Sequence, residues 1–258
     1  MKNYLIIVEG AHDIALIEKL LCLNGINEKI NNADDLPGVW KHTIPTRYPF
    51  NAERLERISP IPSFVKNPEI SVAIKNANSD TEIMFVLKQT LQLMEVSEVD
   101  KLSGIMLVCD ADNNTADVKR QRLLASRNED MNFSLNEYTM ELDVNVKKIP
   151  LYTFIFPDNE NGGNLENLLL QTAEIAYPEL LALAKEYVKS ASVYRNDLKK
   201  EQKAKKAVVG CIANVMKPGK ANQVSIADDD WVSFKTLHEC NMLQKLNTEL
   251  KKMISYNS

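Results

Sequence analysis

The chain has 258 residues, of which 45% are hydrophobic and 26% charged, and its net charge at pH 7 is −4. This length and apolar content suffice for one sizeable domain, or for a domain with a smaller appendage. The acidic balance argues against a protein that is basic overall and binds nucleic acid through its net charge, although a local basic patch or a bound metal ion could reverse the sign at a site.

Cysteine usage and apolar runs indicate the compartment. The four cysteines, Cys22, Cys109, Cys211 and Cys240, are far apart and form neither a zinc-binding pattern nor a disulfide framework. The apolar run near the N-terminus has only about five residues, too few for a signal peptide, and no stretch approaches the ~20 apolar residues of a membrane span. We therefore expect a cytoplasmic protein.

The first elements are a buried strand and an amphipathic helix. Residues 4–8, Tyr-Leu-Ile-Ile-Val, form a continuous apolar run rich in β-branched residues, which is typical of a strand covered on both faces. Asp13 then opens a helical pattern that ends at Asn24-Gly25. Residues 31–69 contain six of the ten prolines, and we expect a long irregular insertion there with one short helix at about 51–58.

Regular alternation resumes after the insertion. Strands are predicted at 70–76, 104–110 and 150–156. Helices are predicted from a Ser79–Glu82 capping box to about 96, from 117 to 127, and from Asn164 to Pro178. Such alternation predicts an α/β domain over residues 1–178, with a central parallel sheet of about four strands flanked by helices. Residues 179–258 are expected to form a mostly helical C-terminal extension packed on that domain.

Carboxylates follow three of the four predicted strands. They are Glu9 and Asp13 after the first strand, Asp110 and Asp112 after the third, and Asp158 and Glu166 after the fourth. Each one alone has an ordinary explanation as a solvent-facing strand end, a helix cap or a turn. Together they fall on one edge of the sheet, where clustered carboxylates repel each other unless a cation or protons lie between them. Mg²⁺ prefers such oxygen ligands, and the pattern favours a metal site.

The motifs Val-Glu-Gly-Ala-His-Asp (8–13) and Leu-Val-Cys-Asp-Ala-Asp (107–112) resemble those of the Toprim domain. That domain carries a glutamate after its first strand and an Asp-x-Asp after its third, here Glu9 and Asp110 with Asp112. The segment 156–170, Phe-Pro-Asp-Asn-Glu-Asn-Gly-Gly-Asn-Leu-Glu-Asn-Leu-Leu-Leu, further resembles stand-alone Toprim-like bacterial proteins of the DUF3226 type. Nucleases of the overcoming-lysogenization-defect family carry a comparable glutamate as a second-metal ligand, which corresponds to Glu166.

The resemblance implies a Toprim-like fold and Mg²⁺- or Mn²⁺-dependent chemistry on the phosphodiester bonds of DNA or RNA, most plausibly by a nuclease. Glu9, Asp110 and Asp112 would then be catalytic, and Asp13 and Glu166 would complete the metal ligands. The sequence contains no recognisable topoisomerase tyrosine domain, primase zinc domain or Walker motif. Any ATPase would therefore be a partner chain.

Two other functions stay open. A stand-alone module of this type could hold nucleic acid or a nucleotide without cutting it, under the control of a partner. Asp110-Ala-Asp112 followed by Thr115 also resembles the first motif of haloacid-dehalogenase-like phosphatases, with Asp110 as nucleophile. In those enzymes the motif normally follows the first strand, and this interpretation leaves Glu9 without a role.

Further residues are candidates for substrate binding because of their positions beside these motifs. They are Gly10, His12, Asn113, Asp158, Lys217 and Lys220. The basic run from Lys199 to Lys206 could contact phosphates, but its alternation with Glu201 and Gln202 favours a solvated helix face.

Overall fold

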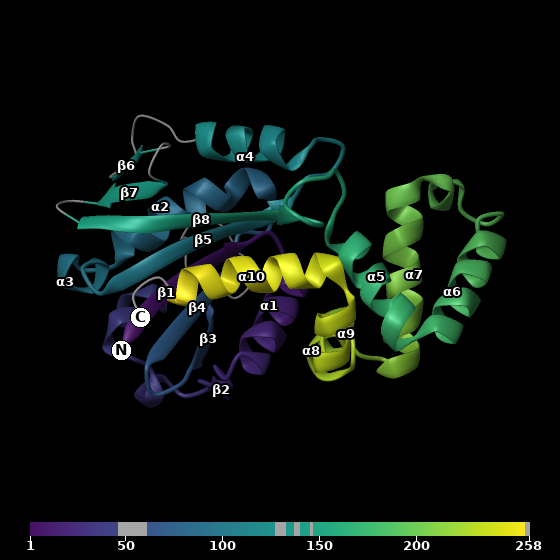
Figure 1. Cartoon of the computed structure of the whole chain (residues 1–258), viewed down its shortest axis with the longest axis horizontal. Coiled ribbons are helices and arrows are strands. Elements are labelled where there is room, and N and C mark those ends of the chain that lie inside the picture. Colours follow the sequence, from purple (N-terminus) through teal and green to yellow (C-terminus); the bar gives the residue numbers. More distant parts are fainter. Residues whose placement is uncertain (46–60, 127–132, 137–139, 145–146, 256–258) are drawn as a thin grey trace.

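The computed structural model describes residues 1–45, 61–126, 133–136, 140–144 and 147–255. Its centre is a sheet in which the four predicted strands lie side by side and parallel, in the order β4-β1-β5-β8 (Figure 1). Their bounds are Lys2–Val8 for β1, Ile70–Asn76 for β4, Leu102–Asp110 for β5 and Lys147–Phe156 for β8. Continuous apolar runs form these strands because helices cover both of their faces.

The sheet is larger than the four strands expected from the sequence, and it is mixed. It has eight strands in the order β2-β3-β4-β1-β5-β8-β7-β6, and the outer ones pair antiparallel. The added strands are β2 (Glu28–Lys29), β3 (Ser63–Lys66), β6 (Phe133–Asn136) and β7 (Glu141–Val144). They have two to four residues each, too few for a period-two pattern to identify them.

The segment 31–69 is therefore not wholly irregular, as the sequence had suggested. It contains β3 and two short 3₁₀ helices, Ala33–Asp35 and Gly38–Thr43. Trp40 in the second of these is fully buried, and its Nε1 donates to Ser71 Oγ at 2.9 Å. The short helix predicted at 51–58 lies outside the described residues.

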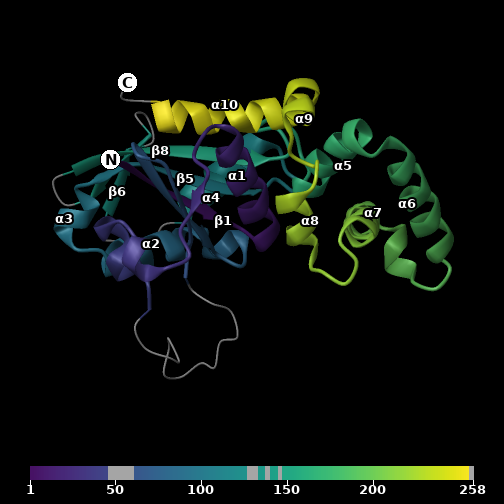
Figure 2. The ribbon, with the colours of Figure 1, turned by 90° about the horizontal axis from the view of Figure 1, so that it is seen from below.

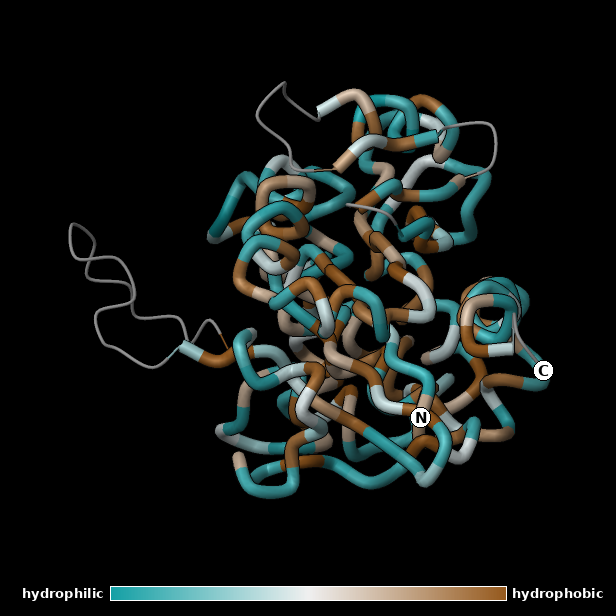
Figure 3. Tube along the Cα trace, turned by 90° about the vertical axis from the view of Figure 1, so that its left-hand side faces the viewer, coloured by the Kyte–Doolittle hydropathy of each residue, from teal (hydrophilic) through white to brown (hydrophobic). Residues whose placement is uncertain are grey.

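Helices cover the sheet in two layers (Figures 1 and 2). Residues Tyr4, Ile6 and Val8 of β1 share one core with α1 (Ala11–Leu23) and α5 (Leu165–Ala176). Leu5 and Ile7 face the other way, into a second core with α2 (Ile83–Leu93) and α4 (Ala116–Ala125). The short helix α3 (Val96–Val99) precedes β5. Hydrophobic stretches lie toward the middle of the molecule, and hydrophilic ones predominate at its periphery (Figure 3).

Helix starts follow local capping, with one change from the prediction. Helix α1 begins at Ala11, two residues before Asp13, and Gly10 is its N-cap. Asp13 is the third helical residue, and its Oδ2 accepts the Gly10 N–H at 2.6 Å. Asn164 caps α5 as predicted, and Asn167 Oδ1 accepts its N–H at 3.2 Å. Ser79 caps a 3₁₀ turn, Asp80–Glu82, that leads into α2, and α2 ends at Leu93 rather than near 96.

The C-terminal part is helical. Its helices are α6 (Pro178–Ala191), α7 (Glu201–Met216), α8 (Asn222–Asp228), α9 (Phe234–Glu239) and α10 (Asn241–Ser255), with a 3₁₀ turn at Asn196–Lys199. Helix α10 crosses the face of the sheet, whereas α6 and α7 stand beyond its end (Figures 1 and 2). No helix among the described residues has both the length and the apolar content of a membrane span.

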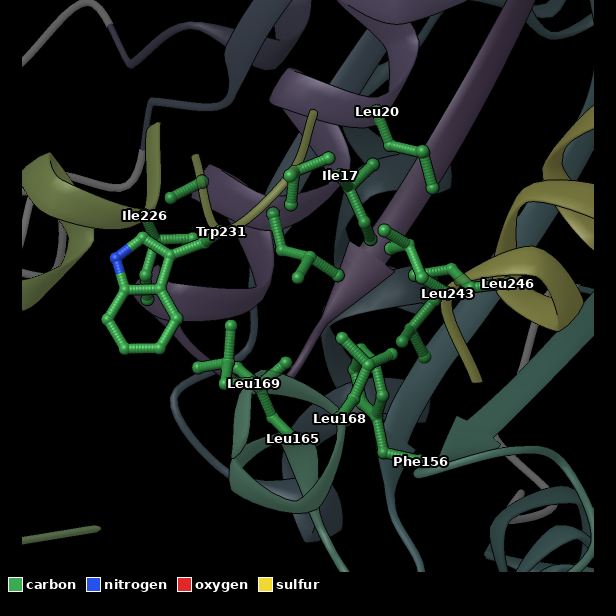
Figure 4. Close-up of a cluster of buried hydrophobic side chains, with 14 of the residues drawn as sticks. Ile17, Leu20, Phe156, Leu165, Leu168, Leu169, Ile226, Trp231, Leu243 and Leu246 are labelled. Atoms are coloured by element: carbon green, nitrogen blue, oxygen red, sulfur yellow. The ribbon is translucent and has the colours of Figure 1, made fainter. Parts of the chain in front are cut away.

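The C-terminal helices share a core with the sheet domain. Leu243 of α10 and Trp231 are fully buried among side chains of α1 and α5 (Figure 4). The Trp231 ring packs edge-on against Tyr177, with centroids 5.5 Å apart, and its Nε1 donates to Ser225 Oγ at 2.9 Å. The two parts are thus joined by a continuous hydrophobic core.

This shared core predicts a large stability difference between two leucines. Leu243→Ala should lower the free energy of unfolding by about 2–5 kcal/mol, because it leaves a cavity between α10 and the sheet domain. Leu183→Ala on α6, where the side chain is 63% exposed, should change it by less than about 0.5 kcal/mol. Chemical denaturation of both variants measures this difference, and equal stabilities would contradict a packed α10.

Candidate functional site

A pocket of about 360 Å³ opens at the carboxyl ends of β1 and β5, between the N-termini of α1 and α5. Ligands of parallel sheets bind at this edge. The pocket brings together four of the carboxylates predicted from the sequence, Glu9, Asp13, Asp110 and Glu166. Its other lining residues are Gly10, Ala11, His12, Asn78, Leu165 and Lys206.

Backbone hydrogen bonds fix three of the carboxylates. Glu9 follows β1, and its Oε2 accepts the N–H of Asp110 on the neighbouring strand at 3.3 Å. Asp110 ends β5, and its Oδ1 accepts the N–H of Leu165, the first residue of α5, at 2.8 Å. Together with the Asp13–Gly10 bond, these contacts bind strand ends to helix N-termini, whose partial positive charge favours carboxylates.

Burial and mutual repulsion make these carboxylates poor acids. Burial is the main cause that raises the pKa of Asp13 to about 8 and that of Asp110 to about 9, and neighbouring carboxylates raise both further. The pKa values of Glu9 and Glu166 are also raised, again mainly by burial. Near neutral pH the pocket therefore retains protons unless a cation replaces them.

Glu166 carries the clearest sign of a missing partner. Its side chain is 8% exposed, and its Oε2 is buried with no hydrogen-bond partner among the described residues. Its Oε1 lies 3.9 Å from Lys206 Nζ, too far for a hydrogen bond. An unsatisfied buried carboxylate oxygen is costly, so a group that completes it would stabilise the folded protein.

The donor set fits a hard divalent cation, although its geometry is not that of a closed metal cage. Four carboxylates offer oxygen ligands only, which suits Mg²⁺ or Mn²⁺. Within the described residues, however, no three Asp, Glu, His or Cys side chains converge closely enough to hold an ion as they stand. Binding would require these side chains to change rotamer.

Asp112 and Asn113 lie beside the pocket without lining it. Asp112 has a left-handed backbone, with φ of 54°, and its N–H and C=O pair with Gly163 at 2.7 and 2.8 Å. Its half-exposed carboxylate lies 3.7 Å from Lys119 Nζ, which also donates to Asp80 Oδ2 at 2.5 Å. Asn113 is exposed.

Of the remaining candidates for substrate binding, Gly10 and His12 line the pocket, whereas Asp158, Lys217 and Lys220 do not. Asp158 accepts the N–H groups of Glu160 and Asn161, at 3.2 and 2.8 Å, and so closes its own loop. Lys217 forms ion pairs near the end of α8, 3.3 Å from Asp228 and 3.7 Å from Asp229. Burial, followed by the charge of Lys206, lowers the pKa of His12.

Two polar lining residues, Lys206 and Asn78, were not identified as site residues from the sequence. Lys206 belongs to the basic run that was expected to be a solvated face, and no local pattern shows that α7 packs on α5 and reaches this pocket. Asn78 follows β4 in a left-handed turn, with φ of 67°. The same rule that selected the strand-end carboxylates would have found it, because β4 ends at the same edge of the sheet.

Comparison with known proteins gives a family and a fold. A family model described as "Protein of unknown function (DUF3226)" matches residues 3–255. The crystal structure of hypothetical protein PH0156 from Pyrococcus horikoshii OT3 is similar with a TM-score of 0.52 and 17% sequence identity, over 97% of this chain and 100% of that one. At this identity the likeness concerns the fold alone. No curated protein matches the chain.

The raised pKa values predict a specific pH dependence of stability without metal. Since folded Asp110 has a pKa near 9 against an ordinary 3.8, the folded state holds the extra proton and loses stability as pH rises through this interval. In EDTA, Asp110→Asn should therefore melt close to wild type at pH 5 but a few degrees above it at pH 8.

A matched control tests whether burial causes this effect. Asp112→Asn should lose stability at pH 8 rather than gain it, because Lys119 is left with a weaker partner. Thermal melts of the three proteins between pH 5 and 8.5 provide the measurement. A constant difference between wild type and Asp110→Asn across this range would show that the Asp110 carboxyl titrates normally.

Proposed function

The chain belongs to the DUF3226 family, and we propose that it is a nuclease that cleaves phosphodiester bonds of nucleic acid with Mg²⁺ or Mn²⁺ bound at the sheet-edge pocket. One observation carries the proposal. Four carboxylates line one pocket, and one of them, Glu166, has a buried oxygen without a partner. A divalent cation would reduce the repulsion between the carboxylates and would give the Glu166 oxygen a partner.

The Toprim assignment is part of this proposal. It is supported by Glu9 and Asp110, which lie at the carboxyl ends of adjacent parallel strands and are joined by a hydrogen bond. Asp110, Asp13 and Glu166 would hold the cation, and Glu9 would act as a further ligand or as the general base. Asp112 would join them after leaving Lys119, with which it shares a contact of 3.7 Å.

When bound, a divalent ion polarises phosphoryl oxygens and offsets the negative charge that develops during in-line displacement. The chain's own residues then have separate tasks. Glu9 is half-buried, and its raised pKa makes it a stronger base than an exposed glutamate, so it can accept a proton from the attacking water. Lys206 is 56% exposed at the pocket and can bind a non-bridging phosphate oxygen.

The phosphatase alternative fits the pocket less well. It gives Glu9 no role, although Glu9 lines the same pocket as Asp110 and accepts the Asp110 N–H. A binding module that does not cut stays a second candidate, because a cation site alone does not require turnover. Any ATPase that drives or regulates the protein would be a separate chain, and we propose a cytoplasmic location, in keeping with four free cysteines.

The proposal predicts that metal binding and the cleavage of nucleic acid depend on the same carboxylates of the pocket. Isothermal titration should show Mg²⁺ or Mn²⁺ binding to wild type that Asp110→Asn and Glu166→Gln weaken by at least tenfold. With labelled single-stranded and duplex DNA and RNA, both variants should cut at least about 100-fold more slowly than wild type. Asp117→Asn, which removes a carboxylate that is 83% exposed on α4, serves as the control and should match wild type.

The outcomes separate the candidates. A wild-type protein that binds neither cation overturns the metal site. A wild type that binds the cation and nucleic acid but leaves every substrate intact indicates the binding module. If Asp117→Asn weakens metal binding as much as Asp110→Asn does, the effect is general acidity rather than the pocket.

A further inference from the structure

The segment from α6 through α7, residues 178–216, is basic within an acidic protein. It contains eight Lys and Arg residues and four Asp and Glu residues, a net charge of +4, while the whole chain carries −4. The rest of the chain therefore has a net charge of −8. These two helices also stand away from the sheet, at the end where α5 begins (Figure 1).

A cavity of about 740 Å³ lies between α5, α6 and α7, and we call it the three-helix cleft. Its walls are largely apolar, with Leu170 of α5, Val188 of α6 and Val208 of α7. Lysines from all sides of the α6–α7 connection surround it, namely Lys185, Lys189, Lys199 and Lys205. Two glutamates, Glu174 and Glu201, also line it, so the cleft combines an apolar interior with an excess of positive charge.

Among the described residues, two of these lysines form ion pairs and two do not. Lys185 lies 3.7 Å from Glu174, and Lys205 lies 2.6 Å from Glu201. Lys189 and Lys199 are exposed, and neither forms an ion pair with a described acidic residue. Their charge is therefore available to an anionic ligand.

The three-helix cleft adjoins the carboxylate pocket. On α5, Glu166 lines the pocket and the next residue, Asn167, lines the cleft. On α7, Lys206 lines the pocket and Lys205 lines the cleft. The two cavities are thus lined by adjacent residues of the same two helices, so a strand that leaves one cavity can reach the other across the surface of α5 and α7.

We infer that the three-helix cleft binds single-stranded nucleic acid, with an unstacked base in the apolar interior and flanking phosphates on the lysine rim, so that the strand continues to the carboxylate pocket. The inference rests on the proposed function, whose substrate class it narrows. A single strand is favoured over a duplex because only unpaired bases can leave the stack and enter an apolar cavity. Lysines that neutralise phosphates supply the rest of the binding.

Binding in EDTA tests the cleft independently of cutting. The probe is a fluorescent 12-nucleotide single strand of mixed sequence, compared by anisotropy with its duplex. Wild type should bind the single strand more tightly, and Lys189→Glu/Lys199→Glu should weaken this binding at least about tenfold and reduce the salt dependence of affinity. The control, Lys251→Glu/Lys252→Glu at the far end of α10, makes the same charge change and should bind as wild type does.

A second variant tests the apolar interior. Ala204→Trp leaves the charge unchanged but fills part of the cleft, since Ala204 is a half-buried lining residue. It should weaken single-strand binding while duplex binding stays as in wild type. Thermal melts establish that the variants compared are folded.

Failure of this inference differs from failure of the proposed function. Wild-type binding that is absent, stronger for duplex, or unchanged in the folded lysine variant overturns the cleft even if the protein cuts nucleic acid. Selective single-strand binding that the lysine variant loses supports the cleft even if Asp110→Asn shows that no metal chemistry takes place. If Ala204→Trp binds the single strand as wild type does, no base enters the cleft.

Discussion

Repulsion among carboxylates at the edge of the parallel sheet is the constraint on which the rest of this site depends. Two adjacent strands end in Glu9 and Asp110, and two helix N-termini add Asp13 and Glu166. When such carboxylates are buried away from water, they must be stabilised by hydrogen bonds, by protonation or by a cation. The fold supplies hydrogen bonds to three of these carboxylates, from the N–H groups of Gly10, Asp110 and Leu165. It leaves Glu166 Oε2 without a donor.

The C-terminal helices give this edge its positive charge. Lys206 reaches the pocket only because α7 packs on α5, and that packing belongs to a core anchored by Trp231 and α10. A chain that is acidic overall thus concentrates lysines on one pair of helices beside its buried carboxylates. Under the proposed function, an anionic polymer would be attracted along its backbone by the lysines and would meet a cation at one phosphate.

The sequence predicted the centre of the molecule better than its margins. Long apolar runs identified β1, β4, β5 and β8 as parallel strands, and the strand ends selected six carboxylates, of which four share a pocket. The outer strands could not be predicted, because segments of two to four residues are too short to show a strand pattern and form only by pairing with neighbouring strands. Lys206 depends on the packing of distant helices, and the direction of Asp112 depends on a left-handed backbone paired with Gly163. Neither leaves a local signal.

The position of Lys119 distinguishes the two sides of this edge. Its ammonium lies between Asp80 and Asp112, at 2.5 and 3.7 Å, so the charges near α4 already have a fixed partner. Glu9 also interacts with the charges near α4, because Asp80 and Asp112 raise its pKa and Lys119 lowers it. On the side of α1 and α5, the nearest ammonium is that of Lys206, exposed and 3.9 Å from Glu166. Among the described residues, Asp13, Asp110 and Glu166 therefore have no ammonium as close to them as Lys119 is to Asp80, and under the proposed function a cation beside them would stabilise their ionised forms.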